Sequence, residues 1–506
     1  MEGKISLIIN SFFFLALFLA FLLPPTDPDL GWHLRCGQEF WQNHTFCSQN
    51  QFTVLLENYY WPNHHWLYQV ILFPIYNFLG LWGLTILNSL FLASAFFLFF
   101  KSLPKDLREE KTFLPILAIG LTIFLAWGVF SFGIRSQLLG FFFFNLILFL
   151  WSKSRQNLAR AVICPLTFLL WANIHGGSVI LGLVLLLFIL IKESFFAPKK
   201  LLFFVFIFLL SVSATLLNPF GVAIYREAWR HFAGVNLSKL IAEWVPPTPF
   251  FWWLILLSAI SLFFLILLSG GVRDFIFAFA IFPFAFLALT ARRHLPFYFL
   301  LWFYLFFTTP ISKNLLVSWL KRDSIKNDLT FLTVVLFLAL GFFFRLPLTI
   351  HTNLSWQNYC QDSSLTYPCK AVEFLKTQGE KGNLFNRYEW GGFLIWQLPQ
   401  FKIFVDGRMP AWKTPSGKSP YTIYLETLQT QPGWGVKSAN QPTTPLPRES
   451  PEATFTGWQE TLKDYNIKWI LISPGTFMDL LLRPEPGKFG WQEIYRDKIS
   501  VIYKKI

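Results

Sequence analysis

The chain has 506 residues, of which 54% are hydrophobic and only 14% are charged, and 62 are phenylalanine. A soluble chain of this length and balance would aggregate, so the composition excludes an ordinary water-soluble globular protein. The formal net charge of +14 comes largely from basic loops between apolar segments and from a basic tail. The charge therefore argues for contact with a membrane surface rather than with nucleic acid.

Apolar runs recur along the first two thirds of the chain, each near the length that crosses roughly 30 Å of hydrocarbon. The pattern predicts a polytopic α-helical membrane protein with about eleven spans. The predicted spans cover residues 5–24, 83–101, 113–131, 137–152, 161–174, 177–192, 201–217, 249–268, 274–291, 296–310 and 329–346.

The first apolar segment shares two features with a signal peptide. Lys4 provides a positive start, and residues 12–23 form an apolar core. The next residues read Pro-Pro-Thr-Asp-Pro-Asp, which contains no small-x-small cleavage site. A retained membrane anchor is therefore favoured, with a cleaved signal peptide as the alternative.

Lysine and arginine predict the orientation in the membrane. They collect in loops at residues 101–111, 153–160, 199–200, 273 and 313–326. The positive-inside rule assigns those loops to the cytoplasm. The intervening loops, and everything after residue 346, are then expected on the extracytoplasmic face of the cell membrane.

Two domains are predicted. Residues 1–346 form the transmembrane domain, whose long first outer loop covers about residues 25–82. Tryptophan and tyrosine recur at helical spacing at residues 32–41 and 66–78, which is typical of interfacial helices. Residues 347–506 form a smaller extracytoplasmic α/β domain.

Local patterns predict the elements of that second domain. Apolar and β-branched runs indicate strands, and clusters of Pro, Gly, Ser and Thr indicate loops. The predicted elements are a helix at residues 371–378, strands at 402–405 and 469–472, a hairpin from 491–495 and 501–503, and a long loop at 410–450.

The five cysteines support an oxidising compartment. Cys36 and Cys47 share the first outer loop, Cys360 and Cys369 share the start of the outer domain, and Cys164 lies alone in a span. Two close pairs on the outer face suggest two local disulfides. The alternative is four free thiols whose placement is accidental.

Strongly polar residues follow several of the spans, and the predicted topology places all of them on the outer face. A lipid-linked substrate and a water-borne substrate could meet on that face. These residues are Asp27, Asp29, Arg135, Asn173, His175, Asn218, Glu243, Arg292, Arg293 and His294.

Several motifs together resemble a group of bacterial multi-pass proteins that are similar to the GT-C superfamily of membrane glycosyltransferases. That superfamily includes protein O-mannosyltransferases and aminoarabinose transferases. The motifs are Asp27-Pro-Asp-Leu-Gly-Trp-His33, Trp61-Pro-Asn-His-His-Trp66, Trp171-Ala-Asn-Ile-His-Gly-Gly177, Asn218-Pro-Phe-Gly221, Glu243-Trp244, Tyr388-Glu-Trp-Gly-Gly392 and Val405-Asp-Gly-Arg408.

The resemblance implies an acidic motif in the first outer loop. Enzymes of the superfamily carry two adjacent acids, or acid-x-acid, there, and Asp27-Pro-Asp29 fits the second form. Many relatives of this chain would read His-Glu-Trp where this chain reads His64-His65-Trp66. Any role of an acid at the central position of that tripeptide is therefore lost.

Asp27 and Asp29 are the candidate catalytic residues. A carboxylate near the headgroup plane can take a proton from an acceptor hydroxyl as it attacks the anomeric carbon of a polyprenyl-phosphate sugar. The alternative is an acidic turn that leaves a helix, because Asp-Pro-Asp is a common turn sequence.

Arg292 and Arg293 are candidates for binding the donor phosphate. Arginine is depleted in outer loops, so two adjacent arginines call for an anionic partner, and a guanidinium suits a phosphate. The alternative is pairing with anionic headgroups or with Glu243. Arg135 is a similar outward cation on a short loop.

Histidines and polar residues complete the candidate binding set. His33, His64, His65 and His175 are all predicted on the outer face, but no HxxxH or HExxH spacing is present. A divalent metal site is therefore the less favoured interpretation, and no cofactor is expected. Instead, His175 and Asn173 are expected to orient polar groups in the cavity, and His294 is expected to join the substrate-binding set. His33 is expected to hydrogen-bond to the substrate or to a neighbouring loop. Glu243 could help bind the acceptor, pair with one of the arginines, or be an ordinary solvated loop acid.

The first hypothesis is an inverting glycosyltransferase that uses a polyprenyl-phosphate sugar. A transporter or flippase for a lipid-linked sugar is the second, but transporters place charges near the midplane and show two similar halves. No such repeat is visible here. The third hypothesis is a non-catalytic assembly protein of the cell envelope.

Overall fold

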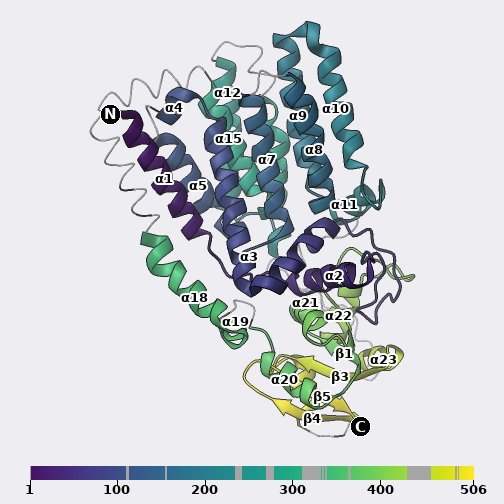
Figure 1. Ribbon diagram of the computed structural model, residues 1–506. Helices are drawn as coiled ribbons and strands as arrows, with labels where there is room; N and C mark the ends of the chain where they lie inside the picture. Colours follow the sequence, from purple (N-terminus) through teal and green to yellow (C-terminus); the bar gives the residue numbers. More distant parts are fainter. Residues whose placement is uncertain are drawn as a thin grey trace. The chain divides into compact units, whose positions relative to one another are not determined.

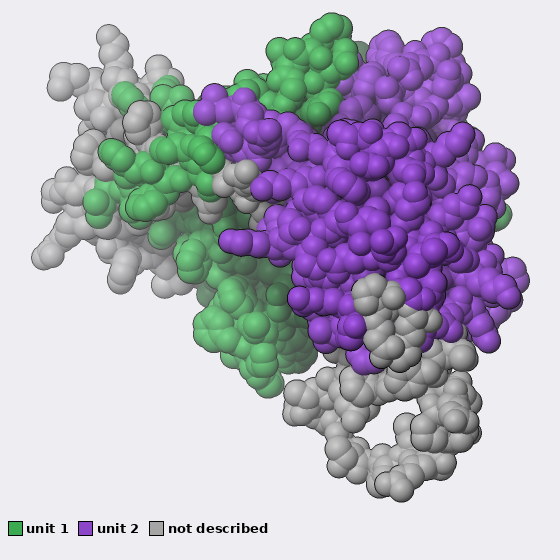
Figure 2. Space-filling model, turned by 90° about the horizontal axis from the view of Figure 1, so that it is seen from below, with its two compact units in different colours: residues 1–25, 62–71, 75–351 green, residues 26–61, 72–74, 352–506 purple. Residues whose placement is uncertain are grey.

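The chain forms two compact units, coloured separately in Figure 2. Unit 1 comprises Met1–Pro25, Pro62–Ile71 and Ile75–His351, and unit 2 comprises Thr26–Trp61, Leu72–Pro74 and Thr352–Ile506. Residues 26–61, from the predicted first outer loop, thus cluster with the C-terminal residues. The computed structural model describes residues 2–109, 113–153, 157–233, 242–268, 278–309, 332, 336, 339–362, 366–429, 457–484, 487 and 489–506.

The regular secondary structure among the described residues of unit 1 is helical. Its segments are apolar on all sides, and in lipid only a helix satisfies every backbone polar group within one such segment. The main helices are α1 (Glu2–Ala20), α3 (Trp66–Ser102), α4 (Lys105–Glu109), α5 (Phe113–Leu125), α6 (Trp127–Phe130), α7 (Ser136–Lys153), α8 (Asn157–His175), α9 (Val179–Phe196), α10 (Leu201–Thr215), α11 (Ala223–Ala233), α12 (Pro249–Leu268), α14 (Ile281–Thr290), α15 (Leu295–Thr308) and α18 (Leu346–Leu354).

Membrane-length helices are present, as predicted. Among the described residues, five helices are long and apolar enough to cross a membrane: Trp66–Ser102, Leu158–His175, Val179–Phe196, Pro198–Thr215 and Pro249–Leu268. Shorter apolar helices cover Asn10–Ala20, Leu114–Leu125, Ser136–Ser152 and Ile281–Thr290. The helical membrane class is confirmed, whereas the count of eleven spans stays a prediction. Part of the predicted last span and the basic loops at 273 and 313–326 lie outside the described residues.

The long helix α3 contains a kink that separates two predicted segments. Gly80 has φ +58° and ψ −147° inside the helix. Only glycine adopts this conformation without strain. The residues before Gly80 match the predicted helix at 66–78, and those after it contain the predicted span at 83–101.

Aromatic contacts fill the interior of unit 1. Figure 1 shows α7, α8, α9 and α10 running side by side, and contacts join α10 to α8 and α9 and join α7 to α8. The ring of Phe96 lies 5.8 Å from Phe21 and 5.4 Å from Phe141, and Phe141 lies 5.8 Å from Phe297. The many phenylalanines therefore tie α3, α7 and α15 into one core, through ring pairs that add to simple burial.

Unit 2 contains a five-stranded sheet in the order β2-β1-β3-β5-β4. The strands are β1 (Gly382–Asn386), β2 (Phe401–Ile403), β3 (Ile467–Ile472), β4 (Trp491–Arg496) and β5 (Val501–Lys505). β1 pairs in parallel with β2 and β3, and the β4–β5 hairpin adds to β3 in antiparallel fashion. β3 is buried at five of its six positions, as expected for an apolar central strand.

The first outer loop extends this sheet. The backbone N–H of Val54 donates to the Ile403 carbonyl at 2.9 Å, and the Ile403 N–H donates to the Phe52 carbonyl at 3.0 Å. These bonds satisfy the open edge of β2, which would otherwise expose unpaired backbone groups. They are one physical reason why residues 26–61 belong to unit 2.

Short helices surround the sheet in Figure 1. Those of unit 2 are α2 (Leu30–Asn43), α19 (Trp356–Asp362), α20 (Cys369–Thr377), α21 (Gly391–Gln397), α22 (Pro420–Gln429), α23 (Gly457–Asp464) and α24 (Phe477–Leu482).

Most of the predicted elements of the second domain are confirmed. The helix at 371–378, the strands at 402–405 and 469–472 and the hairpin correspond to α20, β2, β3 and β4–β5. The prediction of one loop over 410–450 is wrong in part, because α22 begins at Pro420, where proline suits the first helical turn. Residues 430–450 lie outside the described part. Strand β1, with two asparagines and one glycine in five residues, was not predicted.

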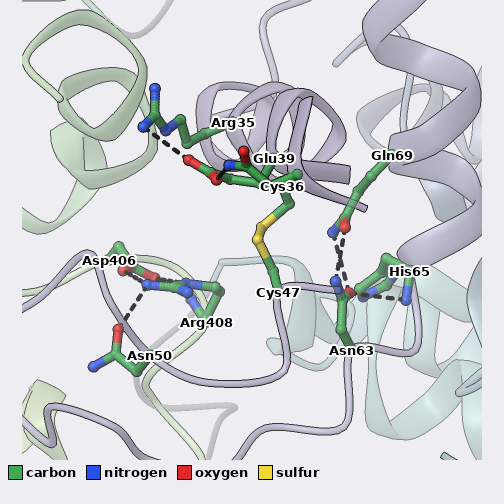
Figure 3. The surroundings of a disulfide bond; sticks show 11 residues. Arg35, Cys36, Glu39, Cys47, Asn50, Asn63, His65, Gln69, Asp406 and Arg408 are labelled. Carbon is green, nitrogen blue, oxygen red and sulfur yellow. Dashed lines mark hydrogen bonds and ion pairs between the residues drawn. A yellow bond between two sulfur atoms is a disulfide. The ribbon is translucent and has the colours of Figure 1, made fainter. Parts of the chain in front are cut away.

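Both disulfides lie in unit 2. Cys36 on α2 bonds to Cys47 across a Cα–Cα distance of 5.5 Å, as shown in Figure 3, and Cys360 bonds to Cys369 across 6.1 Å. Cys164 on α8 is a buried thiol outside any disulfide. These are the two local pairs that the spacing of the cysteines suggests.

Candidate functional site

A buried group of charges in unit 1 joins residues far apart in the sequence. We call Arg135, Gln137, Glu243 and Arg293 the arginine cluster. Arg135 Nη1 donates to Glu243 Oε2 at 2.5 Å, and Arg293 Nη1 lies 3.5 Å from Glu243 Oε1. Arg293 Nη2 also donates to Gln137 Oε1 at 3.1 Å. The short segments η3 (Ala242–Trp244) and η4 (Arg292–His294) carry the acid and the second arginine.

Among the described residues of the arginine cluster, two guanidinium groups contact one carboxylate. Burial by itself would raise the pKa of Glu243, but the charges of Arg135 and Arg293 outweigh it and lower that pKa. Glu243 is therefore ionised at neutral pH, and one carboxylate serves two guanidinium groups. The side chains of Arg293, Arg135 and Glu243 are only 14%, 15% and 20% exposed. The described residues of the cluster thus place two guanidinium groups in a poorly hydrated environment, where a guanidinium group suits an anion.

The Arg292-Arg293-His294 motif does not act as one unit. Arg292 is exposed, and its Nε donates to the Pro246 carbonyl at 3.3 Å. Arg293 instead points into the arginine cluster and lies 4.6 Å from the Trp244 ring centroid. Burial, together with the charge of Arg293, lowers the pKa of His294 to about 3. His294 is therefore neutral beside a charged arginine.

Four histidines gather in the same unit. The ring of His64 lies 4.0 Å from His65, 6.0 Å from His175 and 6.4 Å from His231. Burial lowers the pKa of His64 to about 3, with His231 and Arg293 adding to the effect. Nevertheless, no group of three or more His, Cys, Asp or Glu among the described residues could hold a metal ion.

Acidification should destabilise unit 1 through the buried imidazoles. The pKa values of His64 and His294 are about 3 in the folded chain, below the ~6.5 of an unfolded chain. Folding therefore favours the neutral forms, and their stabilisation is full above pH ~6.5 and is lost as the pH falls toward 3. We expect the Tm of the chain to fall between pH 7 and pH 5, and to fall less in His294→Phe. An equal loss in both proteins would contradict the assignment.

Asn173 and His175 make contacts that position neighbouring helices. Asn173 Oδ1 accepts from Trp66 Nε1 at 2.8 Å, and its Nδ2 donates to the Leu169 and Leu217 carbonyls. His175 Nδ1 accepts the Ser178 N–H at 3.0 Å. The amide of Asn173 therefore holds α8 to the start of α3 and the end of α10.

The acidic pair belongs to unit 2, at the start of α2. Asp29 is the residue before this helix, and its Oδ1 accepts from Trp32 Nε1 at 2.9 Å. Asp27 is 3% exposed, and its Oδ1 accepts the Asp29 N–H at 3.3 Å. His33 is also 3% exposed and lies 3.7 Å from the Trp32 ring. Asp27 thus shapes the turn, whereas the less buried Asp29 presents its carboxylate beside the indole.

Two tyrosines that sequence reasoning missed lie near the acids. Burial raises the pKa of Tyr388 well above its usual range, and the charge of Asp29 raises it further. The pKa of Tyr367 is also raised by burial, with Tyr359, Asp27 and Asp29 adding to the effect. Both hydroxyls therefore stay protonated near the acidic pair. The only sequence signal for either is the position of Tyr388 in the Tyr388–Gly392 motif.

A buried ion pair follows strand β2. Arg408 donates through Nε to Asp406 Oδ1 at 2.9 Å and through Nη2 to Asp406 Oδ2 at 2.6 Å, as Figure 3 shows. The two side chains are 1% and 0% exposed. The guanidinium also lies 5.1–5.9 Å from four aromatic rings, those of Trp32, Phe52, Trp61 and Trp412.

No protein-family model and no curated protein matches the chain. Among solved structures, the chain is similar to the crystal structure of ArnT from Cupriavidus metallidurans bound to undecaprenyl phosphate. The identity is 13% and the TM-score is 0.49, over 100% of this chain and 99% of that chain.

Proposed function

We propose that the chain is an inverting membrane glycosyltransferase that moves a sugar from a polyprenyl-phosphate donor to an acceptor. The observation that carries the proposal is the arginine cluster, in which Arg135 and Arg293 both contact the carboxylate of Glu243. Two poorly exposed guanidinium groups held at one place suit a phosphate anion better than they suit a neutral ligand. The proposed topology keeps eleven spans, with the residues after 346 on the extracytoplasmic face.

The proposed reaction is a single displacement. The acceptor hydroxyl oxygen attacks the anomeric carbon, and the bond from that carbon to the phosphate oxygen breaks. The polyprenyl phosphate leaves with the bonding electrons, and the hydroxyl proton passes to the Asp29 carboxylate. The configuration at the anomeric carbon is inverted, because attack and departure occur on opposite faces of the sugar.

Each group has a proposed role. Arg293 and Arg135 bind the donor phosphate and stabilise its growing charge, while Glu243 sets the spacing of the two guanidinium groups. Asp27 orients Asp29 through the bond from the Asp29 N–H. His175 and the neutral His294 line the donor site.

The test uses the full chain purified into lipid nanodiscs. The probes are undecaprenyl phosphate mannose, undecaprenyl phosphate glucose and undecaprenyl phosphate aminoarabinose, with a membrane extract as the source of acceptor. Release of undecaprenyl phosphate, measured by mass spectrometry, is the expected result for at least one probe. Movement of the intact lipid across a bilayer without release would support the flippase instead. Neither release nor movement would support an assembly protein.

The arginine cluster predicts a graded response to substitution. Arg293→Gln should weaken binding of undecaprenyl phosphate by roughly 10–100-fold, the value of a charged hydrogen-bonded contact. Arg292→Gln should have a smaller effect, because Arg292 is exposed and bonds to a carbonyl. Arg226→Gln, which removes an exposed arginine of α11, is the control. Equal affinity in Arg293→Gln and the parent chain would remove the phosphate site from this cluster.

A further inference from the structure

The turn that carries Asp29 is held by glycine backbones of the C-terminal residues, all within unit 2. An added Cβ at Gly392 would overlap the Pro28 carbonyl oxygen, and one at Gly31 would overlap the Gly392 carbonyl oxygen. The backbones of α2 and α21 therefore approach each other closely at these two glycines. Such close approach requires glycine at both positions.

Gly407 lies against the side chain of Asp29 itself. A Cβ at this position would overlap Oδ1 of Asp29 and lie 2.9 Å from its Cγ. Trp32 Nε1 donates to the same Oδ1 at 2.9 Å. The carboxylate is thus bounded by an indole N–H and by the bare backbone of residue 407.

The loop that carries Gly407 is itself firmly held. Asp406 Oδ1 accepts the backbone N–H of Arg408 at 2.9 Å, in addition to the bidentate side-chain pair. Arg408 Nη2 also donates to Asn50 Oδ1 at 3.2 Å. Gly391 packs against the Val405 carbonyl and Asp406, where an added Cβ would lie 2.5 Å and 2.7 Å from backbone atoms. The loop can therefore act as a fixed wall against the carboxylate.

We infer that Gly407 is a positioning residue that sets the location of the Asp29 carboxylate. This inference rests on the proposed function for its effect on the reaction. It also assigns a role to the C-terminal residues of the chain, which would form the wall that holds the proposed base. The Asp406-Gly407-Arg408 and Tyr388–Gly392 motifs then serve one purpose, which is to hold the turn from Pro28 to Gly31.

The chemistry of the contact makes Gly407→Ala an informative variant. The added methyl group meets the end of a short side chain, so the carboxylate can rotate away while the backbone stays in place. Gly407 has no left-handed φ, so alanine brings no backbone strain there. The variant should therefore fold with a displaced carboxylate, and displacement of a reacting group by about 1 Å can lower a rate by roughly 100-fold.

The kinetic test measures transfer from the lipid-linked sugar that is active with the parent chain. Gly407→Ala should lower kcat by about 10–100-fold with little change in KM, because binding of the donor phosphate does not depend on Asp29. Gly457→Ala is the matched control, since Gly457 in α23 is exposed, with no atom within 4 Å of an added Cβ. An unchanged kcat in Gly407→Ala would overturn the positioning role.

A stability cycle tests the contact without reference to activity. Gly407→Ala should lower the Tm in the parent background and should lower it much less in the Asp29→Ala background, where the opposing carboxylate is gone. Gly392→Ala should lower the Tm equally in both backgrounds, because it meets the Pro28 backbone. Equal losses for Gly407→Ala in the two backgrounds would overturn the inference. If the parent chain transferred no sugar, the proposed function would fail, and this cycle would still decide whether Gly407 sets the position of Asp29.

Discussion

Asp29→Asn should lower the rate of sugar transfer by roughly 10²–10⁴-fold, the usual contribution of a general base. Asparagine keeps an oxygen that can accept the Trp32 N–H, which is 2.9 Å from Asp29 Oδ1. It cannot take a proton from the acceptor. The variant should therefore fold normally, bind undecaprenyl phosphate as the parent chain does, and lose turnover. Release of undecaprenyl phosphate and binding of the same lipid are the two measurements.

Two further variants test whether the loss of turnover is specific to Asp29. Asp464→Asn removes an exposed carboxylate of α23 and should keep full turnover. Asp27→Asn should lower the rate of sugar transfer less than Asp29→Asn does. Asp27 is 3% exposed and serves as the acceptor for the Asp29 N–H. Undiminished transfer in the Asp27→Asn/Asp29→Asn double variant would exclude a catalytic role for the acidic pair.

Asp406→Asn should lower the free energy of unfolding by about 3–5 kcal/mol, which is typical when one partner of a buried ion pair is removed. Arg408 is 1% exposed at its side chain and would be left without its bidentate carboxylate. Contacts with four aromatic rings remain, but cation–π contacts contribute only about 0.5–2 kcal/mol each. Thermal and denaturant unfolding of the full chain in detergent would measure the loss.

The matched control is an exposed ion pair in the same unit. Lys418 and Glu426 are 52% and 33% exposed at their side chains. Glu426→Gln should therefore lower the free energy of unfolding by less than about 1 kcal/mol. A double variant, Asp406→Leu with Arg408→Met, should recover much of the stability because it leaves no unpaired buried charge. A loss in Asp406→Asn no larger than that in Glu426→Gln would show that the buried pair does not hold this loop.

Local patterns in the sequence were sufficient for most secondary structure. Long apolar runs predicted the helices of unit 1, because crossing hydrocarbon requires both length and an internally bonded backbone. Alternation and β-branched residues predicted β2, β3 and the β4–β5 hairpin. The two elements that were not predicted, β1 and α22, also have local causes. β1 has asparagine at both Asn383 and Asn386, and α22 lies in a stretch rich in turn residues.

The sequence also identified the polar residues of interest, but it left their partners open. It offered Arg292 and Arg293 as a phosphate-binding pair, with pairing to Glu243 as an alternative. In the structure Arg293 contacts Glu243 and Gln137, and Glu243 also bonds to Arg135. The sequence treated Asn173 as a substrate contact, whereas its amide bonds to Trp66 and two backbone carbonyls. Side chains one residue apart on a short helical turn point in different directions, and sequence adjacency does not reveal which one is buried.

By itself, the sequence determined that this is a helical membrane protein with a C-terminal α/β portion, with two local cysteine pairs and an acidic motif after the first apolar segment. These features depend on composition, periodicity and short spacing, all of which can be read within a few turns of chain. Only the tertiary structure decided that residues 26–61 share a unit with the C-terminal sheet and that Gly407 lies against Asp29. Asp29 and Gly407 are far apart in the sequence, and their contact joins a side-chain carboxylate to a glycine backbone. A glycine leaves no periodic signal in the sequence that would predict such a contact.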